Sequence, residues 1–336
     1  MNPTQPPQAM AAALSALLGR ERFLTDSQSL QHYGRDWTRF AAPAPSGVLL
    51  PTTISEIQAI VGLARQNGVK LVPSGGRTGL SGGAMATNGE LVLSLERMRK
   101  ILPVNQAERS VTCEAGAITA QIQRAAATEG LMYPVDFASS GSSQIGGNIA
   151  TNAGGIQVIR YGMTRDWVTG LKVVTGTGEL LELNQGLIKN NTGLDFRHLF
   201  IGSEGILGVI VEATLALTDP PRNPRVMVLG VRSMAALMQV LASCQAQLSI
   251  LAFEFFSDLA LEKVTAEHSI QPPLQERYPF YALVEFESSS ATAETQALEL
   301  VEACMARGWV ADAVLSQSES QRRSLWRLRE DISETI

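Results

Sequence analysis

The sequence predicts an α+β fold divided into two domains, and three observations lead to this prediction. The 336 residues are more than one ordinary domain holds. Hydrophobic residues make up 45% of the chain and charged residues 18%, which is enough apolar material for a large core. Helix-like and strand-like patterns alternate, and the Asp-Pro-Pro-Arg segment at 219–222 interrupts them. We therefore expect a tail and helix over residues 1–32, one domain over 33–220 and another over 221–336.

Charge and cysteine content exclude several classes of protein. The net charge is −5 and no stretch concentrates Lys and Arg, so nucleic acid is not expected as a partner. Cys113, Cys244 and Cys304 lie far apart and form no CxxC pair. A sparse and odd set of cysteines suits a reducing compartment, and it argues against a disulfide framework or a structural zinc site.

The N-terminal residues do not have the pattern of a signal peptide. Residues 10–18 are apolar, but prolines rather than basic residues precede them. A signal peptide requires a basic segment at that place, so we expect a short alanine-rich helix after a loose tail. No apolar run approaches the length of a transmembrane helix. We expect a cytoplasmic protein without a transmembrane segment.

The first domain opens with the clearest local pattern of the chain. Apolar residues recur at helical spacing over 54–64. Thr53 and Glu56 form a capping-box pattern at the start of this helix, and Gly68 predicts its end. A strand over 69–73 then leads directly into a glycine-rich segment.

Strand patterns dominate the rest of this domain. Strands are expected at 168–175 and 180–183, because Gly176-Thr177-Gly178 between them is a hairpin signal. Near-alternation of apolar residues predicts a long strand over 206–217. The other expected elements are strands at 91–95 and 111–115 and a helix at 117–129.

Helices and strands alternate again after the break. This βαβ-like alternation predicts a compact α+β domain. The expected elements are a helix at 234–247, a strand at 252–256, a second helix, a strand at 281–287 and a helix at 293–307.

The segment 74–83 holds five glycines in ten residues, with hydroxyl side chains between them. Glycines allow a positive φ and a close approach of the backbone, so consecutive N–H groups can surround an anion. The segment has no GxGxxG spacing and no Lys-Ser or Lys-Thr after it, which disfavours a Rossmann fold and a P-loop. By itself it is equally compatible with a flexible surface loop.

Two further segments make the surface-loop interpretation less favourable. Residues 145–155 are nearly all small, with Asn148 and Asn152 as the only amides, and residues 202–208 are again glycine-rich. We expect each of the three segments to lie next to a strand. Small residues at these places predict backbone packed closely against a planar ligand.

Several motifs together resemble a known family. They are Val72–Gly79, Ile145–Gly155, Arg160-Tyr161-Gly162, Asn191–Asp195 and its continuation His198–Gly205. On these motifs the sequence resembles the FAD domain of the vanillyl-alcohol-oxidase type, in the branch of D-lactate, glycolate and D-2-hydroxyglutarate dehydrogenases. The match is collinear from about Tyr33 to the last residue.

The resemblance implies a two-subdomain FAD-binding domain followed by a truncated α+β cap domain. In the family the loop corresponding to 74–79 wraps the FAD pyrophosphate, 134–155 lies along the ribityl chain and the isoalloxazine ring, and Gly205-Ile206 is near the adenosine. Covalent relatives have a histidine where this chain has Arg77, so FAD is expected to be non-covalent. The implied FAD-binding residues are Pro73, Ser74, Gly75, Gly76, Arg77, Thr78, Gly79, Leu80, Pro134, Ser142, Gly146, Gly147, Asn148, Thr151, Asn152, Ala153, Gly154, Glu204, Gly205 and Ile206.

The stretch Ser324–Glu330 has two interpretations. Its mixed charges are typical of an amphipathic surface helix. The resemblance instead implies that Arg329 binds the substrate carboxylate, which a guanidinium holds with two parallel hydrogen bonds. Ser333, four residues later on the same helix face, would add a hydroxyl. Residues 252–256 and 279–281 also match the cap domain, and we expect them to be core strands.

No metal site is expected in this chain. Family members continue into a His-x-Gly-Asp-Gly-Asn-x-His segment and a later glutamate that bind a divalent metal, and neither is present. His32, His198 and His268 are scattered, as structural or surface histidines are. The chain stops at Ile336 inside an expected helix without a stop signal. We expect a fragment of a longer protein, with the catalytic base and the divalent metal beyond Ile336.

The resulting hypothesis is FAD-dependent oxidation of a D-2-hydroxy acid to the 2-oxo acid, with hydride transfer to flavin N5. A separate electron acceptor is expected (an electron-transfer flavoprotein, a quinone or a cytochrome), since no nicotinamide motif or iron–sulfur cysteine set is visible. A quinone or cytochrome would bring the protein to the inner membrane, and a homodimer is compatible with the sequence. Three alternatives stay open: a non-catalytic FAD-binding fragment or subunit, an oxidase that uses O₂ directly, and oxidation of an alcohol or sugar.

Overall fold

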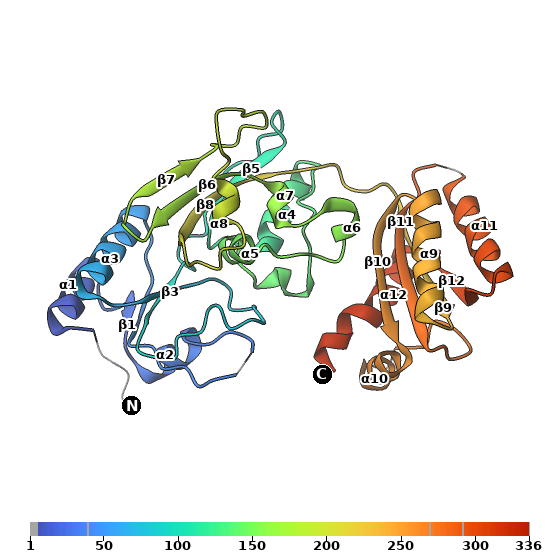
Figure 1. The fold of residues 1–336 in the computed structure, drawn as a ribbon, viewed down its shortest axis with the longest axis horizontal. Coiled ribbons are helices and arrows are strands. Elements are labelled where there is room, and N and C mark those ends of the chain that lie inside the picture. The colour runs from blue at the N-terminus through green and yellow to red at the C-terminus, as the bar shows by residue number, and fades with distance from the viewer. Residues whose placement is uncertain (1–5, 39, 269, 291, 336) are drawn as a thin grey trace. The chain divides into compact units, whose positions relative to one another are not determined.

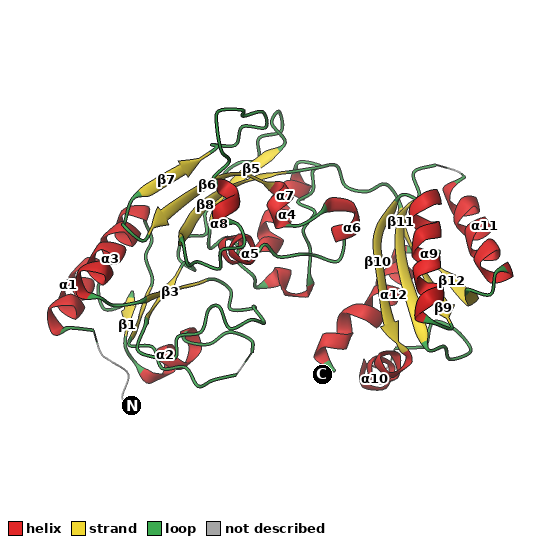
Figure 2. Ribbon diagram, viewed as in Figure 1, coloured by secondary structure: helices red, strands yellow, loops and turns green. Residues whose placement is uncertain are grey.

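The computed structural model describes residues 6–38, 40–268, 270–290 and 292–335, and the chain divides into two compact units (Figure 1). Unit 1 is Met1–Gly154 and Met163–Asp219, and unit 2 is Gly155–Gly162 and Pro220–Ile336. Helices and sheets occur in both units, as expected for the predicted α+β class (Figure 2). Within the described ranges no helix combines the length and the apolar character needed to cross a membrane.

The first sheet of unit 1 contains the two strands on either side of the glycine-rich loop, one that leads into it and one that follows it. Its strand order is β1-β2-β4-β3, in which β2 and β3 run parallel to β4 and β1 is antiparallel to β2. The elements of this part are α1 (Gln8–Leu18), β1 (Phe23–Leu24), α2 (Ser27–Tyr33), β2 (Gly47–Leu49), α3 (Ile54–Asn67), β3 (Leu71–Ser74) and β4 (Leu91–Ser94). The predicted helix is confirmed with its cap: Thr53 Oγ1 accepts from the Glu56 N–H at 3.2 Å, and Gly68 ends α3 at φ 64°. The second half of the expected capping box differs, because the Glu56 carboxylate accepts from the Thr52 N–H at 2.7 Å.

The second sheet of unit 1 is antiparallel throughout, in the order β5-β8-β6-β7. Its hairpin β6–β7 is the one predicted at 176–178. The long strand starts at Gly208, two residues later than predicted, because Glu204 and Gly205 take positive φ and turn the backbone first. The elements here are β5 (Ser110–Glu114), α4 (Thr119–Thr128), η1 (Ala138–Gly141), α5 (Ile145–Thr151), α7 (Thr164–Trp167), β6 (Val168–Thr175), β7 (Leu180–Leu183), α8 (Arg197–Phe200) and β8 (Gly208–Ala216).

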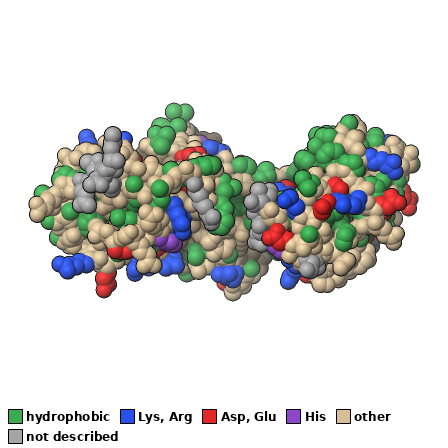
Figure 3. All heavy atoms as spheres, turned by 90° about the horizontal axis from the view of Figure 1, so that it is seen from below, with side chains coloured by type: hydrophobic (Ala, Val, Ile, Leu, Met, Phe, Trp, Pro, Cys, Tyr) green, Lys and Arg blue, Asp and Glu red, His purple; other side chains and the backbone are tan. Residues whose placement is uncertain are grey.

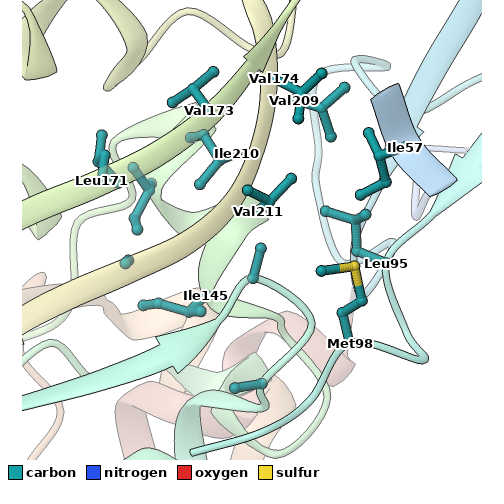
Figure 4. Close-up of a cluster of buried hydrophobic side chains, with 14 of the residues drawn as sticks. Ile57, Leu95, Met98, Ile145, Leu171, Val173, Val174, Val209, Ile210 and Val211 are labelled. Carbon is teal, nitrogen blue, oxygen red and sulfur yellow. The ribbon is translucent and has the colours of Figure 1, made fainter. Parts of the chain in front are cut away.

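One hydrophobic core joins both sheets of unit 1. Figure 4 shows part of it, with Val209 and Val211 of β8 among side chains that include Ile57 of α3 and Leu95 after β4. Ile145, at the start of α5, belongs to the same core and is fully buried. The segment 145–155 lies next to a strand through tertiary packing, since its first half forms the helix α5, which packs on β8.

Unit 2 contains a four-stranded sheet in the order β10-β11-β9-β12, with every neighbouring pair antiparallel. The helix-connected strands β9 and β10 are separated by β11, so the expected βαβ alternation is present in split form. Helices α9 and α11 pack on one face, and α10 and α12 on the other (Figure 2). The elements are α6 (Val158–Tyr161), β9 (Pro224–Val231), α9 (Met234–Gln247), β10 (Ile250–Ser257), α10 (Asp258–His268), β11 (Phe280–Glu287), α11 (Ala293–Ala306), β12 (Val310–Leu315), α12 (Glu319–Glu330) and η2 (Asp331–Glu334).

The predicted helix through the end of the chain is corrected by the structure. α12 stops at Glu330, and the Asp331 carboxylate accepts from Arg327 Nε at 3.0 Å one turn earlier. A 3-10 turn over Asp331–Glu334 follows α12. Ser333 therefore lies in η2 and not on the α12 helix, and its side chain is outside the described residues.

A buried carboxylate on β11 holds several parts of unit 2 together. Glu285 is only 1% exposed. Its Oε1 accepts from Arg322 Nη1 at 2.5 Å and from Trp326 Nε1 at 3.1 Å, both on α12. Its Oε2 accepts from Gln157 Nε2 at 2.8 Å, next to α6. A buried charge needs such a set of donors, so Glu285 ties the segment 155–162 and α12 to the sheet.

Arg322→Met is expected to destabilise unit 2 by about 3 kcal/mol, because it leaves the buried Glu285 without its cationic partner. The measurement is the midpoint of urea unfolding followed by circular dichroism. Arg323→Met is the matched control, since the Arg323 side chain is 76% exposed and forms an ion pair with Glu319 at the surface. Equal midpoints for the two variants would contradict this role of Glu285.

Gly116→Ala is expected to destabilise the protein by about 2 kcal/mol or more through overpacking. An added Cβ would lie 2.0 Å from the Leu95 carbonyl oxygen and 2.6 Å from that of Met98. Gly62→Ala on α3 is the control, because no atom lies within 4 Å of its added Cβ and alanine favours a helix by about 1 kcal/mol. Thermal unfolding should lower the midpoint for the first variant and keep or raise it for the second.

Candidate functional site

The glycine-rich loop, α5 and the turn at Glu204 surround a cavity in unit 1. Its volume is about 620 Å³, including its open mouth. A smaller hollow of about 410 Å³ lies next to it and shares Pro73, Gly75, Gly147, Ala150 and Glu204 with it. The cavity is lined by Asp36, Pro73, Gly75, Gly76, Arg77, Thr78, Gly79, Ser81, Gly83, Ala84, Gln144, Gly147, Asn148, Ala150, Thr151 and Glu204.

Some glycines at this cavity are required by close backbone contact. A Cβ added to Gly76 would lie 2.3 Å from the Ser142 carbonyl oxygen and 2.9 Å from Ser143 Cα. One added to Gly146 would lie 2.7 Å from the Ala115 Cβ. These contacts bring the loop after β3, the start of α5 and the end of β5 together at distances that a larger residue prevents.

Gly79 and Gly147 have the opposite environment. Both line the cavity, and no protein atom lies within 4 Å of an added Cβ at either position. The volume that a side chain would fill there is part of the cavity itself. The absence of side chains on both walls leaves room for a ligand to approach the backbone.

Three residues at the site have a left-handed backbone although they are not glycine. They are Arg77 at φ 58°, Asn152 at φ 50° and Glu204 at φ 52°. Such conformations are uncommon for residues with a Cβ and are maintained by the surrounding structure. Here the Asn152 Oδ1 accepts from the Arg165 N–H at 2.9 Å, and the Glu204 N–H donates to the Ala150 carbonyl at 2.8 Å.

The cavity walls contain buried polar atoms that the protein leaves unpaired. Within the described part of the chain, Asp36 Oδ2, Ser74 Oγ and Gln144 Oε1 have no hydrogen-bond partner. Asp36 and Gln144 line the cavity, and Ser74 lines the adjacent hollow. Buried polar groups are nearly always paired, so these atoms fit a ligand that itself has several hydrogen-bonding groups. FAD has such groups along its whole length.

Arg77 is held in place by aromatic neighbours. Its guanidinium lies 4.7 Å from the centre of the Tyr33 ring, and Nη2 is 3.0 Å from His32 Nε2. Burial, then the charges of Arg77 and Arg35, lower the pKa of His32, so the neutral ring accepts from Arg77. Burial and the hydrogen bond from Tyr33 to Glu96 at 2.7 Å raise the pKa of Tyr33 to about 12. A fixed cation therefore stands in the wall of the cavity.

The structure brings most of the predicted FAD-binding residues together, but not all. Leu80 and Ile206 are 72% and 84% exposed and do not line either hollow, and the Asn148 amide donates to Thr119 Oγ1 at 2.7 Å. The other predicted residues outside both linings are Pro134, Ser142, Asn152, Ala153 and Gly154. Of the lining residues that the sequence did not single out, Ser81, Gly83, Gln144 and Ala150 lie inside the predicted segments 74–83 and 134–155, whereas Asp36 and Ala84 lie outside them.

On unit 2, Arg329 is engaged by a carboxylate of its own chain. Its Nε donates to Glu254 Oε2 at 2.7 Å, and the two side chains are 36% and 23% exposed. Arg322, Trp326 and Arg329 follow each other at helical spacing on α12, and all three bond to carboxylates of the sheet. The amphipathic character expected of α12 is observed: Trp326 on the face toward the sheet is 5% exposed, while the Arg323 side chain on the other face is 76% exposed.

Other side chains that could bind a metal or react are dispersed. No group of three or more His, Cys, Asp or Glu side chains that could hold a metal ion is found in the described ranges. Cys113, Cys244 and Cys304 are buried free thiols, and burial raises the pKa of each. The face in Figure 3 carries acidic and basic side chains with uncharged ones between them.

Comparison with known proteins agrees with the geometry of the site. The family model "FAD binding domain" matches residues 45–184, and "FAD linked oxidases, C-terminal domain" matches 220–336. An alkyldihydroxyacetonephosphate synthase structure aligns with a TM-score of 0.77 at 18% identity, covering 98% of this chain and 65% of that one. A p-cresol methylhydroxylase structure aligns with a TM-score of 0.77 at 15% identity, covering 98% and 70%. The expected fold is confirmed: an FAD-binding domain of this type followed by an α+β domain.

Curated relatives are more similar in sequence. A D-2-hydroxyglutarate dehydrogenase of Xanthomonas citri pv. viticola is 56% identical, over 94% of this chain and 66% of the relative. One of Stutzerimonas stutzeri is 54% identical, over 98% and 71%. The mitochondrial D-2-hydroxyglutarate dehydrogenase of Bos taurus is 34% identical, over 94% and 58%. The chain thus spans about two thirds of these bacterial relatives, and less of the bovine one. It belongs to the FAD-linked 2-hydroxy acid dehydrogenases of the vanillyl-alcohol-oxidase type, in the branch that includes the D-2-hydroxyglutarate dehydrogenases.

Proposed function

We propose that this protein oxidises a D-2-hydroxy acid to the 2-oxo acid with FAD, and that D-2-hydroxyglutarate is the first substrate to test. The observation that carries the proposal is the cavity with its adjacent hollow, which three glycine-rich segments form and whose walls hold unpaired polar atoms. The curated relatives support the substrate class, since three of them are named D-2-hydroxyglutarate dehydrogenases. In this proposal residues 33–220 bind FAD and residues 221–336 contribute to the substrate site.

The loop 74–79 is proposed to hold the FAD pyrophosphate. Its glycines let backbone N–H groups face an anion, and the fixed guanidinium of Arg77 adds a positive charge beside them. The cofactor is proposed to be non-covalent, because Arg77 stands where covalent relatives have a histidine. When bound, FAD supplies the hydride acceptor at flavin N5.

Arg329 is proposed to bind the substrate carboxylate. A guanidinium offers five N–H donors, and the bond from Nε to Glu254 uses one of them. Glu254 occupies Nε, so the substrate carboxylate is proposed to bind through the two terminal nitrogens of the guanidinium. Binding there would fix the orientation of the 2-hydroxy acid.

The electron acceptor and the location of the protein are also proposed. We propose a separate electron acceptor (an electron-transfer flavoprotein, a quinone or a cytochrome), which reoxidises the flavin after each turnover. A cytoplasmic location is proposed, supported by the three free thiols. The electron acceptor is tested by measuring turnover without oxygen in the presence of each candidate acceptor.

The decisive experiment uses the protein made from its complete reading frame. Its visible spectrum is recorded without oxygen before and after addition of D-2-hydroxyglutarate, D-lactate or glycolate. Bleaching of the flavin by one of these acids supports the proposal. A colourless protein that does not take up FAD would overturn the cofactor assignment. A yellow protein bleached only by an alcohol or sugar would overturn the substrate class, and one bleached by nothing would favour a non-catalytic flavin subunit.

Gly147→Leu is expected to fold normally but to bind FAD about 100-fold more weakly, because the new side chain occupies the ligand's place in the cavity. Gly62→Leu is the matched control: Gly62 is also helical, its added Cβ meets no atom within 4 Å, and it lines neither hollow. FAD affinity is measured by quenching of flavin fluorescence on titration of apo-protein. Unchanged affinity in Gly147→Leu would remove the cavity from the cofactor site.

Arg329→Lys is expected to lower kcat/KM for the 2-hydroxy acid by about 10- to 100-fold, because a single ammonium cannot replace two parallel hydrogen bonds. Lysine keeps a positive charge beside Glu254, so the fold of α12 should be retained. Arg323→Lys on the exposed side of the same helix should leave kcat/KM within about twofold. Steady-state kinetics check both, and equal kcat/KM values would exclude Arg329 from the substrate site.

A further inference from the structure

We propose that Asp36 is a cofactor-binding residue that accepts a hydrogen bond, through Oδ2, from a hydroxyl or N–H group of FAD. The proposal rests on the proposed FAD site and adds to it a residue more than thirty positions before the glycine-rich loop. The partner group is a neutral donor of the cofactor and not its pyrophosphate.

Asp36 belongs to the wall of the cavity although it is far from the glycine motifs in sequence. It is 5% exposed and lines the cavity with residues of the glycine-rich loop. Its segment is fastened to that loop by backbone hydrogen bonds: the Trp37 N–H donates to the Gly79 carbonyl at 3.3 Å, and the Ala86 N–H donates to the Gly34 carbonyl at 2.9 Å. The position of Asp36 is therefore set by the same loop that is proposed to hold the cofactor.

The two carboxylate oxygens of Asp36 have different environments. Oδ1 accepts from the Thr38 N–H at 2.9 Å and from Thr38 Oγ1 at 2.6 Å, which is an Asx turn. Oδ2 is buried and has no hydrogen-bond partner among the described residues. Local structure explains the first oxygen but not the second. A buried carboxylate oxygen without a donor is costly, and a donor on a ligand in the cavity would remove that cost.

The negative charge of the Asp36 carboxylate limits which part of FAD can lie next to Oδ2. An ionised carboxylate accepts hydrogen bonds and donates none, and it repels a phosphate. Arg77 lines the same cavity and provides the positive charge that a pyrophosphate needs. Asp36 is therefore assigned to a group that donates a hydrogen bond and carries no negative charge. FAD offers the ribose and ribityl hydroxyls, the adenine amino group and the flavin N3–H.

Asp36→Asn separates this role from the role in the turn. The asparagine Oδ1 still accepts from Thr38, while an NH2 group replaces Oδ2. This NH2 group would face the proposed hydrogen-bond donor of FAD, so the hydrogen bond is lost. We expect FAD to bind at least about tenfold more weakly, as for loss of a hydrogen bond to a charged group. If Asp36 only stabilised the turn, affinity would stay the same or rise, because a negative charge is removed from the site of an anionic cofactor. The two interpretations thus differ in the sign of the effect.

The measurement is the dissociation constant of FAD for apo-protein, by quenching of flavin fluorescence. Thr38→Val is the matched control, because the hydroxyl that it removes bonds to Oδ1 and to Met85 Sδ but not to Oδ2, so affinity should stay within about twofold. Asp36→Ser is a second variant, since a serine hydroxyl closes the same kind of turn without a second oxygen. It should also lose FAD affinity, and it replaces Asp36→Asn if far-UV circular dichroism shows that the asparagine variant is unfolded.

FMN and ADP as competing ligands identify the half of FAD that Asp36 contacts. Weaker binding of FMN by Asp36→Asn assigns the contact to the flavin half, and weaker binding of ADP assigns it to the adenosine half. Unchanged or tighter FAD binding by both Asp36 variants overturns the inference and leaves the proposed function intact. A wild-type protein that binds no FAD overturns the proposed function itself.

Discussion

The close contact between the glycine-rich loop and the backbone before α5 is the constraint on which the rest of the site depends. At Gly76 the loop approaches the carbonyl of Ser142 so closely that a single methyl group would lie 2.3 Å from the oxygen. At Gly146 the start of α5 approaches Ala115 at the end of β5 in the same way. Two sheets with separate strand orders share one core, and strands of both sheets line the smaller hollow. The glycines are needed here to let backbones meet and not to make the loop flexible.

Close packing of backbone leaves few side chains to bind a ligand, and the polar groups that remain are correspondingly important. In the cavity wall, glycines leave room for a ligand, and the guanidinium of Arg77 is held in place by Tyr33. Buried oxygens of the wall have no hydrogen-bond partner among the described residues. Left-handed backbone at Arg77 and Glu204 turns these segments toward the cavity. Strain of this kind persists where the surrounding structure determines it, as at binding sites.

Unit 2 uses carboxylates on its sheet to position a helix. Glu285 and Glu254 lie on adjacent strands and receive Arg322, Trp326 and Arg329 from one face of α12. The fully buried carboxylate has three donors, while the partly exposed one pairs with the arginine proposed to meet substrate. Burial thus makes one pair structural and leaves the other accessible to a competing carboxylate. Because Arg322, Trp326 and Arg329 are spaced by about one helical turn, α12 presents the structural pair and the accessible pair on one face.

The sequence by itself determined the fold class, α3 with its cap, the β6–β7 hairpin and the three glycine-rich segments, because these depend on periodicity and local turn chemistry. Only the tertiary structure decided what depends on contacts between distant segments. It turned 145–151 into a helix, ended α12 at Glu330, and separated β9 from β10 by β11. It also placed Asp36 in the cavity wall, which no local pattern indicated. The sequence of an Asx turn predicts the turn but does not determine which part of the fold the turn contacts.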